Sequence, residues 1–477
     1  MYTGVIFILP EIVISVMSCI ILLFDVFISK SKRSVIYYLS LLALIFSAIS
    51  IFYLREEPRC ILFDGAFVFD SFSILLKLAI IFIALVIFIY SRKYIVYIDL
   101  YKGEYFALCL MSILGMMVMI SSGTFLTLYL GLELLSLPIY SLIVMNKSNV
   151  SSEASMKYFI MGSVASGIFL FGVSLVYGIT GAIELNLINK VIVEEKVFSN
   201  TTLQYGLVFI ISGLVFKFGA VPFHMWVPDV YEGSPVPIAL FVSTIPKIAA
   251  LGMSYRLLSD TFSSVNNELE FLFIIIGIAS LFVGNIFAIS QLNIKRLLAY
   301  SAIAHVGFIF LGFIVSDSND FSSVIFYVIV YVISSLGAFG IIMALSSKLR
   351  EAELINDFKG LGLSKPIFGV TMVLFLLSLA GVPPTAGFYA KFFILNNLIY
   401  SGYLELAIFA LLMSVIGAFY YLKVIKVMFF EECDENCLEN VKIFGMNSLG
   451  MAIILINGMV ILFVGVFPKL VLNYCFV

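Results

Sequence analysis

Apolar segments of about 20 residues recur along the whole 477-residue chain and leave little sequence outside them. A helix of that length crosses the hydrocarbon core of a bilayer. Inside lipid, every backbone donor and acceptor must be satisfied within the protein, so only helices and closed barrels span it. Charged residues make up 12% of the chain, about half of the roughly 25% that is usual in soluble domains. The sequence therefore predicts an all-α polytopic membrane protein.

About fourteen transmembrane helices are predicted. The first apolar segment contains Glu11 and lacks both a basic start and a small-residue cleavage site, which is typical of a retained helix and not of a signal peptide. The predicted spans lie near residues 5–28, 35–54, 71–90, 105–121, 124–145, 158–180, 204–226, 236–258, 271–290, 297–315, 321–346, 367–400, 405–428 and 447–469.

Basic residues are distributed unequally between the loops that these spans leave on the two sides of the membrane. If both termini face outward, seventeen lysines and arginines fall in inner loops, Lys295 and Arg296 among them, and six fall in outer loops. An excess of basic residues marks the cytoplasmic side of a membrane protein, so both termini are predicted to be periplasmic. The six outer residues are Arg55, Arg59, Lys190, Lys196, Arg256 and Lys469.

Three lysines fall deep inside predicted spans. Lys217, Lys247 and Lys391 each have apolar neighbours on both sides and cannot easily reach either interface. A lysine at this depth costs about 2.5–3.5 kcal/mol on insertion scales, so such a residue usually lines a wet cavity or pairs with an opposite charge. Glu133 is the only carboxylate near the centre of a predicted span and is the obvious acidic partner.

Lysine and glutamate in this setting are suited to moving protons. Loss of solvation lowers the pKa of a buried lysine and a nearby carboxylate raises it, so a change in their separation switches the amine between holding and releasing a proton. Arginine cannot act in this way, because it keeps its proton. The alternative is a structural pairing of helices, but one glutamate cannot neutralise three lysines. The pattern therefore favours a proton relay.

The other charged residues within or beside spans have simpler interpretations. Lys77 lies early in its span, where its side chain can extend to the interface. Glu11 and Asp25 lie near the ends of the first helix, where interfacial solvation accounts for them. His305 lies within a span and titrates near neutrality, so it is predicted to join the relay, with a hydrogen bond to a neighbouring helix as the alternative. His224 lies beside prolines and is predicted to order a helix break.

Two of the spans are predicted to be broken. The segment 367–400 would form a straight helix of about 50 Å, well beyond a hydrocarbon core of about 30 Å, and a Gly-Val-Pro-Pro run at 381–384 interrupts it. Pro222 and Pro228 interrupt the chain after Lys217, because proline lacks a backbone donor and clashes with the preceding turn. Broken helices at corresponding positions of two halves are typical of transporters.

Weak internal similarity indicates a repeat. The segment 132–144 resembles 297–309, and the Gly/Ser-rich span at 158–180 has a counterpart at 321–346. Each unit would contain five helices, and an odd number of crossings inverts one unit relative to the other. We therefore expect an N-terminal three-helix segment, two inverted five-helix repeats that each contain a broken helix, and a C-terminal helix. The predicted boundaries are 1–104, 105–258, 271–430 and 431–477.

The two broken stretches also resemble a known family. The stretches FKFGAVPFHMWVPDVYEGSPVPIALFVSTIPKIAA (216–250) and GVPPTAGFYAKF (381–392) closely resemble the signatures of subunit N, an antiporter-like membrane subunit of bacterial NADH-quinone oxidoreductase (respiratory complex I). The similarity runs over essentially the whole chain. One conservative departure is Ser234, where the family pattern leads us to expect alanine.

The resemblance implies a multi-pass subunit of the bacterial inner membrane that translocates protons. It implies that partner chains carry NADH, FMN, the iron–sulfur clusters and quinone, and that their redox chemistry drives this subunit. The implied partners are the antiporter-like subunit M, the small membrane subunits and the lipid bilayer. The residues implied to form the proton path, with His305 along its central axis, are Glu133, Lys217, Lys247, His305 and Lys391.

The sequence itself shows little that could bind a cofactor or nucleic acid. It has no GxGxxG after a strand and no four-cysteine set, which nicotinamide and iron–sulfur sites require. Cys433 and Cys437 are two thiols without a nearby histidine, so free thiols in a loop are a better interpretation than a metal site. No basic stripe with interleaved aromatic residues suggests nucleic-acid binding.

Two alternatives remain open at this point. Subunits of Mrp-type Na⁺(K⁺)/H⁺ antiporters share the implied fold and its glutamate–lysine pattern. The chain could also be a structural spacer whose charges only pair helices. Subunit M usually carries glutamate where Lys391 stands, and the VPDVYEGSP and PPTAGFYAK stretches resemble subunit N specifically.

Overall fold

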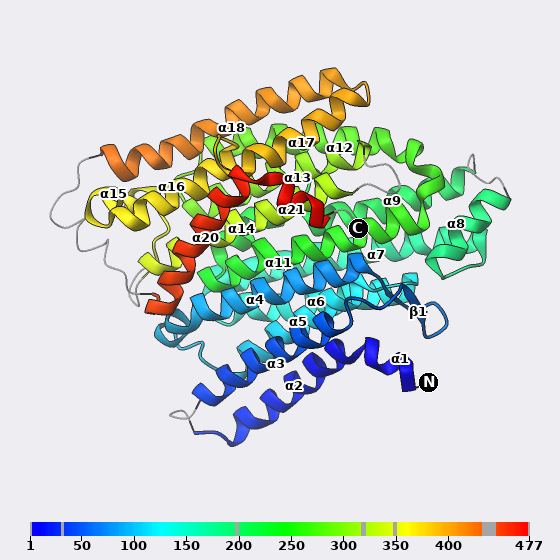
Figure 1. The fold of residues 1–477 in the computed structure, drawn as a ribbon, viewed down its shortest axis with the longest axis horizontal. Coiled ribbons are helices and arrows are strands. Elements are labelled where there is room, and N and C mark those ends of the chain that lie inside the picture. Colours follow the sequence, from blue (N-terminus) through cyan, green and yellow to red (C-terminus); the bar gives the residue numbers. More distant parts are fainter. Residues whose placement is uncertain are drawn as a thin grey trace. The chain divides into compact units, whose positions relative to one another are not determined.

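The computed structural model describes residues 2–29, 33–195, 200–315, 321–346, 351–431 and 445–475. Within these residues, thirteen helices are long and apolar enough to cross a membrane (Figure 1). This confirms the predicted all-α polytopic fold. The long helices are α2 (Leu9–Phe27), α3 (Ser34–Tyr53), α4 (Ser71–Tyr97), α5 (Gly103–Ile120), α6 (Phe125–Val144), α7 (Asn149–Thr180), α9 (Thr201–Phe218), α11 (Val236–Tyr255, continued by a π-helical turn at Arg256–Thr261), α12 (Asn266–Ile289), α13 (Ile294–Val315), α14 (Ser322–Leu345), α18 (Leu404–Phe430) and α20 (Ser448–Val466).

Two shorter helices replace the long segment that the sequence predicts to be broken. Helix α16 (Pro366–Ala380) ends at Gly381, which adopts a left-handed conformation with φ of 82°, and α17 (Ala386–Tyr400) follows. Each half has 15 residues, about 22 Å of helix. Neither half alone is long enough to cross a hydrocarbon core of about 30 Å. The break at Pro383 and Pro384 is therefore confirmed.

The chain is also broken after Lys217, as predicted. Helix α9 ends at Phe218, the short helix α10 (Trp226–Gly233) follows, and α11 begins at Val236. His224 lies in the non-helical segment between α9 and α10, where the sequence places it.

Burial differs strongly between helices. Side chains on all sides of α11, α13 and α14 are buried, whereas α2, α7 and α18 expose much of their apolar surface. Examples of the exposed residues are Leu23 on α2 and Val415 on α18. A helix that is apolar all round is stable either inside a protein or in a membrane, so the exposed apolar faces are those that meet lipid or partner chains.

Contacts divide the chain into two compact units. The first comprises Met1–Leu85, Asp99–Phe218 and Ile245–Leu269. Within it, α5 and α6 approach so closely that a Cβ atom on Gly115 would lie 2.3 Å from the backbone nitrogen of Leu135. Small residues allow such close packing of helices in membranes, where apolar burial alone does not drive association.

The second unit comprises Val86–Ile98, Gly219–Thr244 and Glu270–Val477. A Cβ atom on Gly284 of α12 would lie 2.5 Å from the backbone nitrogen of Ala304 on α13. The same unit contains α16 and α17, so the second helix break belongs to it.

Several short elements were not predicted from hydropathy. Strands β1 (Cys60–Leu62) and β2 (Phe67–Phe69) form an antiparallel hairpin between α3 and α4. The amphipathic helix α8 lies between α7 and α9, and three further short helices lie elsewhere in the chain. These segments are too short to cross a membrane, so hydropathy over a 20-residue window does not detect them. The short helices are α1 (Tyr2–Phe7), α8 (Leu185–Glu194), α15 (Leu361–Ser364) and α21 (Pro468–Cys475).

Candidate functional site

The first group of predicted site residues lies in the first unit, where α9 ends. Lys217 is the second-to-last residue of α9, and its ammonium donates a 2.6 Å hydrogen bond to the Ser136 hydroxyl of α6. Lys247 of α11 donates to the carbonyl of Phe218, the last residue of α9. The carbonyls at the end of a helix have no partners within the helix and carry partial negative charge. Such an end stabilises an ammonium without a full opposite charge.

Glu133 lies on the same side of α6 as the serine that binds Lys217. Its carboxylate accepts a short hydrogen bond from Ser166 of α7. Ser136 is three residues further along α6, and residues three apart are neighbours on a helix surface. In the part of the chain that the structure describes, no ion pair within 4 Å joins Glu133 to a lysine. Glu133 and Lys217 are thus each bound by a different serine, Ser166 and Ser136, and do not form the predicted direct pair.

The second helix break, in the second unit, holds a lysine in the same way. Lys391 lies on α17, and its ammonium donates 2.8 Å hydrogen bonds to the carbonyl of Ala380 and to the Ser414 hydroxyl of α18. Ala380 is the last residue of α16. Each unit therefore has a lysine bound to the C-terminal carbonyl of a helix that ends at a break.

His305 lies on α13 and is buried, as predicted. One ring nitrogen, Nδ1, is 2.7 Å from the Tyr327 hydroxyl of α14, and Nε2 is 3.3 Å from the Tyr421 hydroxyl of α18. A neutral imidazole donates from one nitrogen and accepts at the other, while a tyrosine hydroxyl does both, so either tautomer satisfies this arrangement. The predicted hydrogen bond to a neighbouring helix is present, and it is compatible with proton transfer.

Two small cavities, each at the lower limit of the space that one water molecule needs, lie around His305 and Lys391. Both residues line both cavities. Ser334 and Ser378 also line the first, and Asn285 also lines the second. The structure therefore brings two of the predicted residues together around small cavities that contain several polar side chains.

The comparisons with known proteins agree on one family. The family described as "NADH:quinone oxidoreductase/Mrp antiporter, TM" matches residues 122–417. The protein named NADH-quinone oxidoreductase subunit N from Thioalkalivibrio sulfidiphilus is 44% identical over 469 residues, which are 98% of this chain and 96% of the relative. The chain belongs to the NADH-quinone oxidoreductase subunit N family. The prediction from the two broken stretches is confirmed.

Solved structures extend the comparison to the fold of the subunit N family. A chain of respiratory complex I from Thermus thermophilus with bound aureothin superposes with a TM-score of 0.81 and 27% identity, covering 97% of this chain and 98% of that one. A chain of the Mrp complex from Dietzia sp. DQ12-45-1b has a TM-score of 0.82 at 20% identity, with 98% and 95% covered, which shows a shared fold alone. All five predicted site residues lie inside the matched range 122–417.

Two N-terminal charges of this subunit N relative are buried, whereas the sequence predicts that an interface solvates them. This prediction is wrong, because α4 and α2 bring Lys77 and Glu11 into a buried ion pair of 2.5 Å. Lys77 also lies 4.8 Å from the centre of the Phe67 ring. The local sequence around each residue cannot reveal a partner two helices away.

Three basic residues assigned to loops belong to helices instead. Lys295 and Arg296 lie in the first turn of α13, and Lys295 is buried by contacts with two glutamates. Arg256 was assigned to an outer loop and is fully buried in the π-helical turn that continues α11. Each of the three is paired with carboxylates, which is why its charge is tolerated there.

Arg256 anchors a buried cluster that the sequence did not indicate. Its guanidinium binds both carboxylate oxygens of Asp70, at 2.7 and 2.9 Å, and donates to Asp260 and to the carbonyl of Ile120. Burial by itself raises the pKa of Asp70, but the charge and hydrogen bonds of Arg256, together with hydrogen bonds from Ser73, outweigh burial and hold the pKa below its ordinary value of 3.8. Asp70 lies just before α4, so the cluster fixes the start of that helix to the end of α11.

A metal site finds no support in the described residues. No group of three histidine, cysteine, aspartate or glutamate side chains there could hold an ion. Cys433 and Cys437, which were predicted to be free thiols, lie outside the described residues.

The close approach of α16 and α17 gives a testable prediction about Gly387. A Cβ atom at Gly387 would lie 1.7 Å from the carbonyl oxygen of Ser378, so one of the two half-helices must shift. We expect Gly387→Ala to lower the free energy of unfolding by roughly 2–3 kcal/mol, in the range of overpacked cores, and to disturb the cavity beside Lys391. Thermal unfolding of the detergent-solubilised protein measures this change.

Gly167 provides the matched control for Gly387. It lies within α7, and no atom outside its own helix backbone is within 4 Å of a Cβ atom built there. Gly167→Ala should therefore leave the unfolding temperature unchanged or raise it slightly, since alanine favours a helix more than glycine does. An equal effect of the two substitutions would contradict the steric argument.

Proposed function

We propose that this chain translocates protons across the bacterial inner membrane as a membrane-arm subunit of NADH-quinone oxidoreductase. One observation carries the proposal. Within the described residues, the ammonium groups of Lys217, Lys247 and Lys391 are buried and are bound by hydroxyl and carbonyl oxygens, without a carboxylate in an ion pair. Such a lysine can lose its proton without leaving an unpaired negative charge behind.

Other buried cations of the same chain show the contrast. Lys77 pairs with Glu11, and Arg256 pairs with Asp70. Loss of a proton from Lys77 would strand a buried carboxylate, which is costly, and arginine does not release its proton. Carboxylates therefore hold Lys77 and Arg256, whereas neutral dipoles hold the three proposed relay lysines.

The proposed path begins at Glu133 and Lys217, continues through Lys247 and His305, and ends at Lys391. A change in the Glu133–Lys217 separation, driven by quinone reduction in partner chains, alters the electrostatic stabilisation of the Lys217 ammonium and moves its proton onward. NADH, FMN, iron–sulfur clusters and quinone are held by those partners, and subunit M and the small membrane subunits are neighbours. Both termini are periplasmic, and protons leave on that side against about 2.3 kcal/mol per 100 mV.

An Mrp-type cation/proton antiporter remains the second candidate. The shared fold of the Dietzia Mrp chain supports it, but the full-length relatives at 44% identity carry the subunit N name. Co-purification with peripheral redox subunits favours the oxidoreductase, and Na⁺- or K⁺-dependent proton exchange without NADH favours the antiporter.

Proton pumping by membrane vesicles that oxidise NADH tests the proposal. Lys217→Met or Lys247→Met should lower the rate of proton uptake relative to NADH oxidation by about tenfold or more, because removal of a positioned proton-transfer group costs on the order of 10²–10⁴-fold in that step. Lys190→Met is the matched control, since Lys190 lies exposed on α8. Normal pumping by both variants in an assembled complex would contradict the relay.

A further inference from the structure

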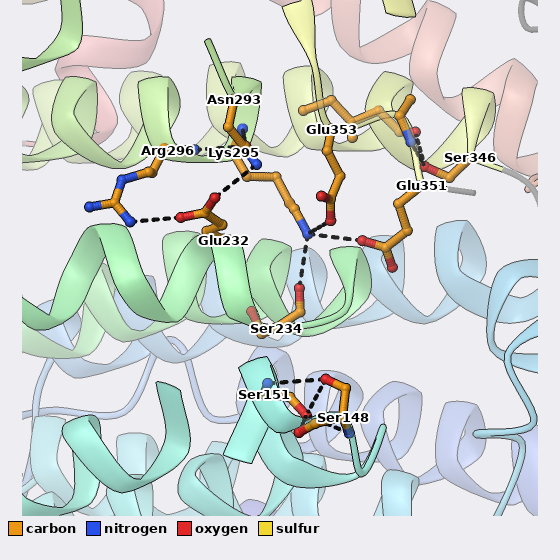
Figure 2. A network of polar contacts seen from close by, with 12 residues as sticks. Ser148, Ser151, Glu232, Ser234, Asn293, Lys295, Arg296, Ser346, Glu351 and Glu353 are labelled. Atoms are coloured by element: carbon orange, nitrogen blue, oxygen red, sulfur yellow. Dashed lines mark hydrogen bonds and ion pairs between the residues drawn. The ribbon is translucent and has the colours of Figure 1, made fainter. Parts of the chain in front are cut away.

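A second buried lysine of the second unit has a different environment from the relay lysines. Lys295 lies in the first turn of α13 and is 1% exposed. Its three N–H groups point to the carboxylates of Glu351 and Glu353, at 2.9 and 2.8 Å, and to the carbonyl of Ser234, at 3.3 Å (Figure 2). All donors of this ammonium are therefore used, and two negative charges face one positive charge.

The two glutamates are held against α13 by backbone contacts. The amide of Ile294 donates to the carbonyl of Glu353 at 2.7 Å, and the amide of Ala352 donates to the Ser346 hydroxyl at 3.1 Å. The segment that carries Glu351 and Glu353 is thereby fixed beside Lys295, so their contacts do not depend on the side chains alone.

The carboxylates differ in their access to the aqueous phase. The Glu353 side chain is 41% exposed and the Glu351 side chain is 21% exposed. Glu351 also accepts a short hydrogen bond from the Tyr94 hydroxyl of α4, whose side chain is buried. Exposure of the side chains thus decreases from Glu353, through the half-buried Glu351, to the buried Lys295.

A neighbouring limb, formed by Arg296 and its two carboxylates, lies beside the Lys295 group. Arg296 binds Asp229 at 3.0 Å and Glu232 at 2.6 Å. Asn293 donates to Glu232 (Figure 2). Among the described residues, Arg296 and Lys295 share no carboxylate, so the two groups can be changed separately.

Helix α13 connects this group with the relay. Ser301 lies six residues beyond Lys295, about 9 Å along the helix axis, and His305 lies ten residues beyond it, about 15 Å. Ser301 forms a short hydrogen bond with Tyr421, and Tyr421 contacts His305. Ser301 and Tyr421 therefore extend the polar contacts of His305 to a point about 9 Å from Lys295 along α13.

We propose that Glu353, Glu351 and Lys295 form the aqueous mouth through which the second unit exchanges protons, so that His305 and Lys391 are supplied through this mouth. The inference rests on the proposed proton relay, and it adds a point of access that the relay residues do not provide. With the termini periplasmic, this end of α13 faces the cytoplasm, and the mouth takes up protons.

The proposed transfer is balanced in charge and atoms. Glu353 first takes a proton from water and becomes a neutral acid, which removes one of the two carboxylates that stabilise the Lys295 ammonium. The ammonium then releases a proton inward toward Ser301 and Tyr421 and becomes a neutral amine. Glu353 passes its proton to that amine, directly or by way of Glu351. The ammonium and both carboxylates are then restored, and one proton has moved from water to the interior.

Proton pumping as a function of pH tests the mouth in vesicles with the assembled complex. Glu353→Gln keeps the shape of the side chain and leaves Glu351 to pair with Lys295. We expect pumping relative to NADH oxidation to fall by about tenfold at about pH 8, where free protons are scarce, and much less at about pH 6. Glu353→Asp should retain most of the rate. Glu232→Gln is the matched control, because it removes a carboxylate from the Arg296 limb without touching Lys295.

A covalent rescue separates proton exchange from structural pairing. Glu353→Cys, assembled and then alkylated with iodoacetate, regains a titratable carboxylate, whereas iodoacetamide adds a neutral amide of similar size; wild-type vesicles treated alike correct for other thiols. Recovery of pumping with iodoacetate alone supports the mouth. Three results would overturn the proposed mouth. The first is equal pumping after both reagents, and the second is a wild-type pH profile of pumping in Glu353→Gln. The third is a loss of pumping in Glu232→Gln as large as that in Glu353→Gln.

Lys391→Met, measured in parallel, distinguishes failure of the mouth from failure of the relay. If Lys391→Met stops pumping and Glu353→Gln does not, the relay stands and the mouth is rejected. If Lys391→Met pumps normally, the proposed function itself is contradicted.

Discussion

Lys391→Met is expected to reduce the rate of proton transfer through this chain by on the order of 10²-fold, the lower end of what a positioned proton-transfer group contributes. Methionine is unbranched and of similar length, so it fills the space that Lys391 occupies between α16 and α18. It cannot donate to Ala380 or Ser414, and it cannot hold a proton between the two small cavities. The measurement is the initial rate of acidification of inverted vesicles, divided by the rate of NADH oxidation.

Lys391→Arg is the variant that separates charge from proton release. Arginine keeps a positive charge and hydrogen-bond donors at the end of α16, so the helix end remains stabilised. It does not give up its proton, so pumping should stay low while the complex assembles normally. Recovery of pumping in Lys391→Arg would mean that a fixed charge suffices, and the relay role of Lys391 would be wrong.

Asp70→Asn is expected to lower the free energy of unfolding by about 3 kcal/mol, the lower end of the cost of breaking a buried ion pair, because Asp260 alone then compensates the buried charge of Arg256. Arg256 is fully buried and binds Asp70 through two hydrogen bonds. Asp260, which remains, contacts the guanidinium through one oxygen at 3.0 Å and cannot replace both. Thermal unfolding in detergent at neutral pH measures the change.

The pH dependence of this stabilisation has a definite sign. The folded pKa of Asp70 lies below its ordinary value of 3.8, so the ion pair contributes its full stability above that value. This contribution is lost as the pH falls below 3.8 through the folded pKa. The difference in unfolding temperature between the wild type and Asp70→Asn should therefore be constant near neutrality and narrow under acid conditions.

A matched exposed pair provides the control for Asp70. Arg55 and Glu56 form an ion pair in the same unit, and both side chains are more than half exposed. Glu56→Gln should leave the unfolding temperature unchanged, because solvent screens exposed pairs. A similar loss in the two variants would show that burial of Arg256 is not the source of the effect.

The apolar character and length of its segments were sufficient to predict the long helices of this fold. The 367–400 segment is longer than a bilayer requires and contains consecutive prolines, so its division into α16 and α17 followed from covalent geometry. The hairpin at Cys60–Leu62 and Phe67–Phe69 was missed, because three-residue strands have no signal above that of a loop. Helix α7 begins at Asn149, nine residues before the predicted span, because Ser148 and Ser151 form a capping box in a polar stretch that hydropathy does not count.

The candidate site was predicted residue by residue, but its pairings were not. An apolar context identifies Lys217, Lys247 and Lys391 as unusual whatever they contact. The identity of each contact depends on residues tens of positions away, such as Ser136 for Lys217. The same limit explains the error at Lys77, whose partner lies in another helix.

The ion pair between Glu11 and Lys77 also constrains the order of events during synthesis. Helix α2 leaves the ribosome well before α4, and a charge held alone in a bilayer costs about 2.5–3.5 kcal/mol even on the mildest scale. In the folded protein Lys77 compensates this charge, since the pair is 2.5 Å long and both side chains are buried. Before the third span is made, Glu11 lacks this partner. We therefore expect the first span to enter the membrane either with Glu11 as its neutral acid or together with the third span.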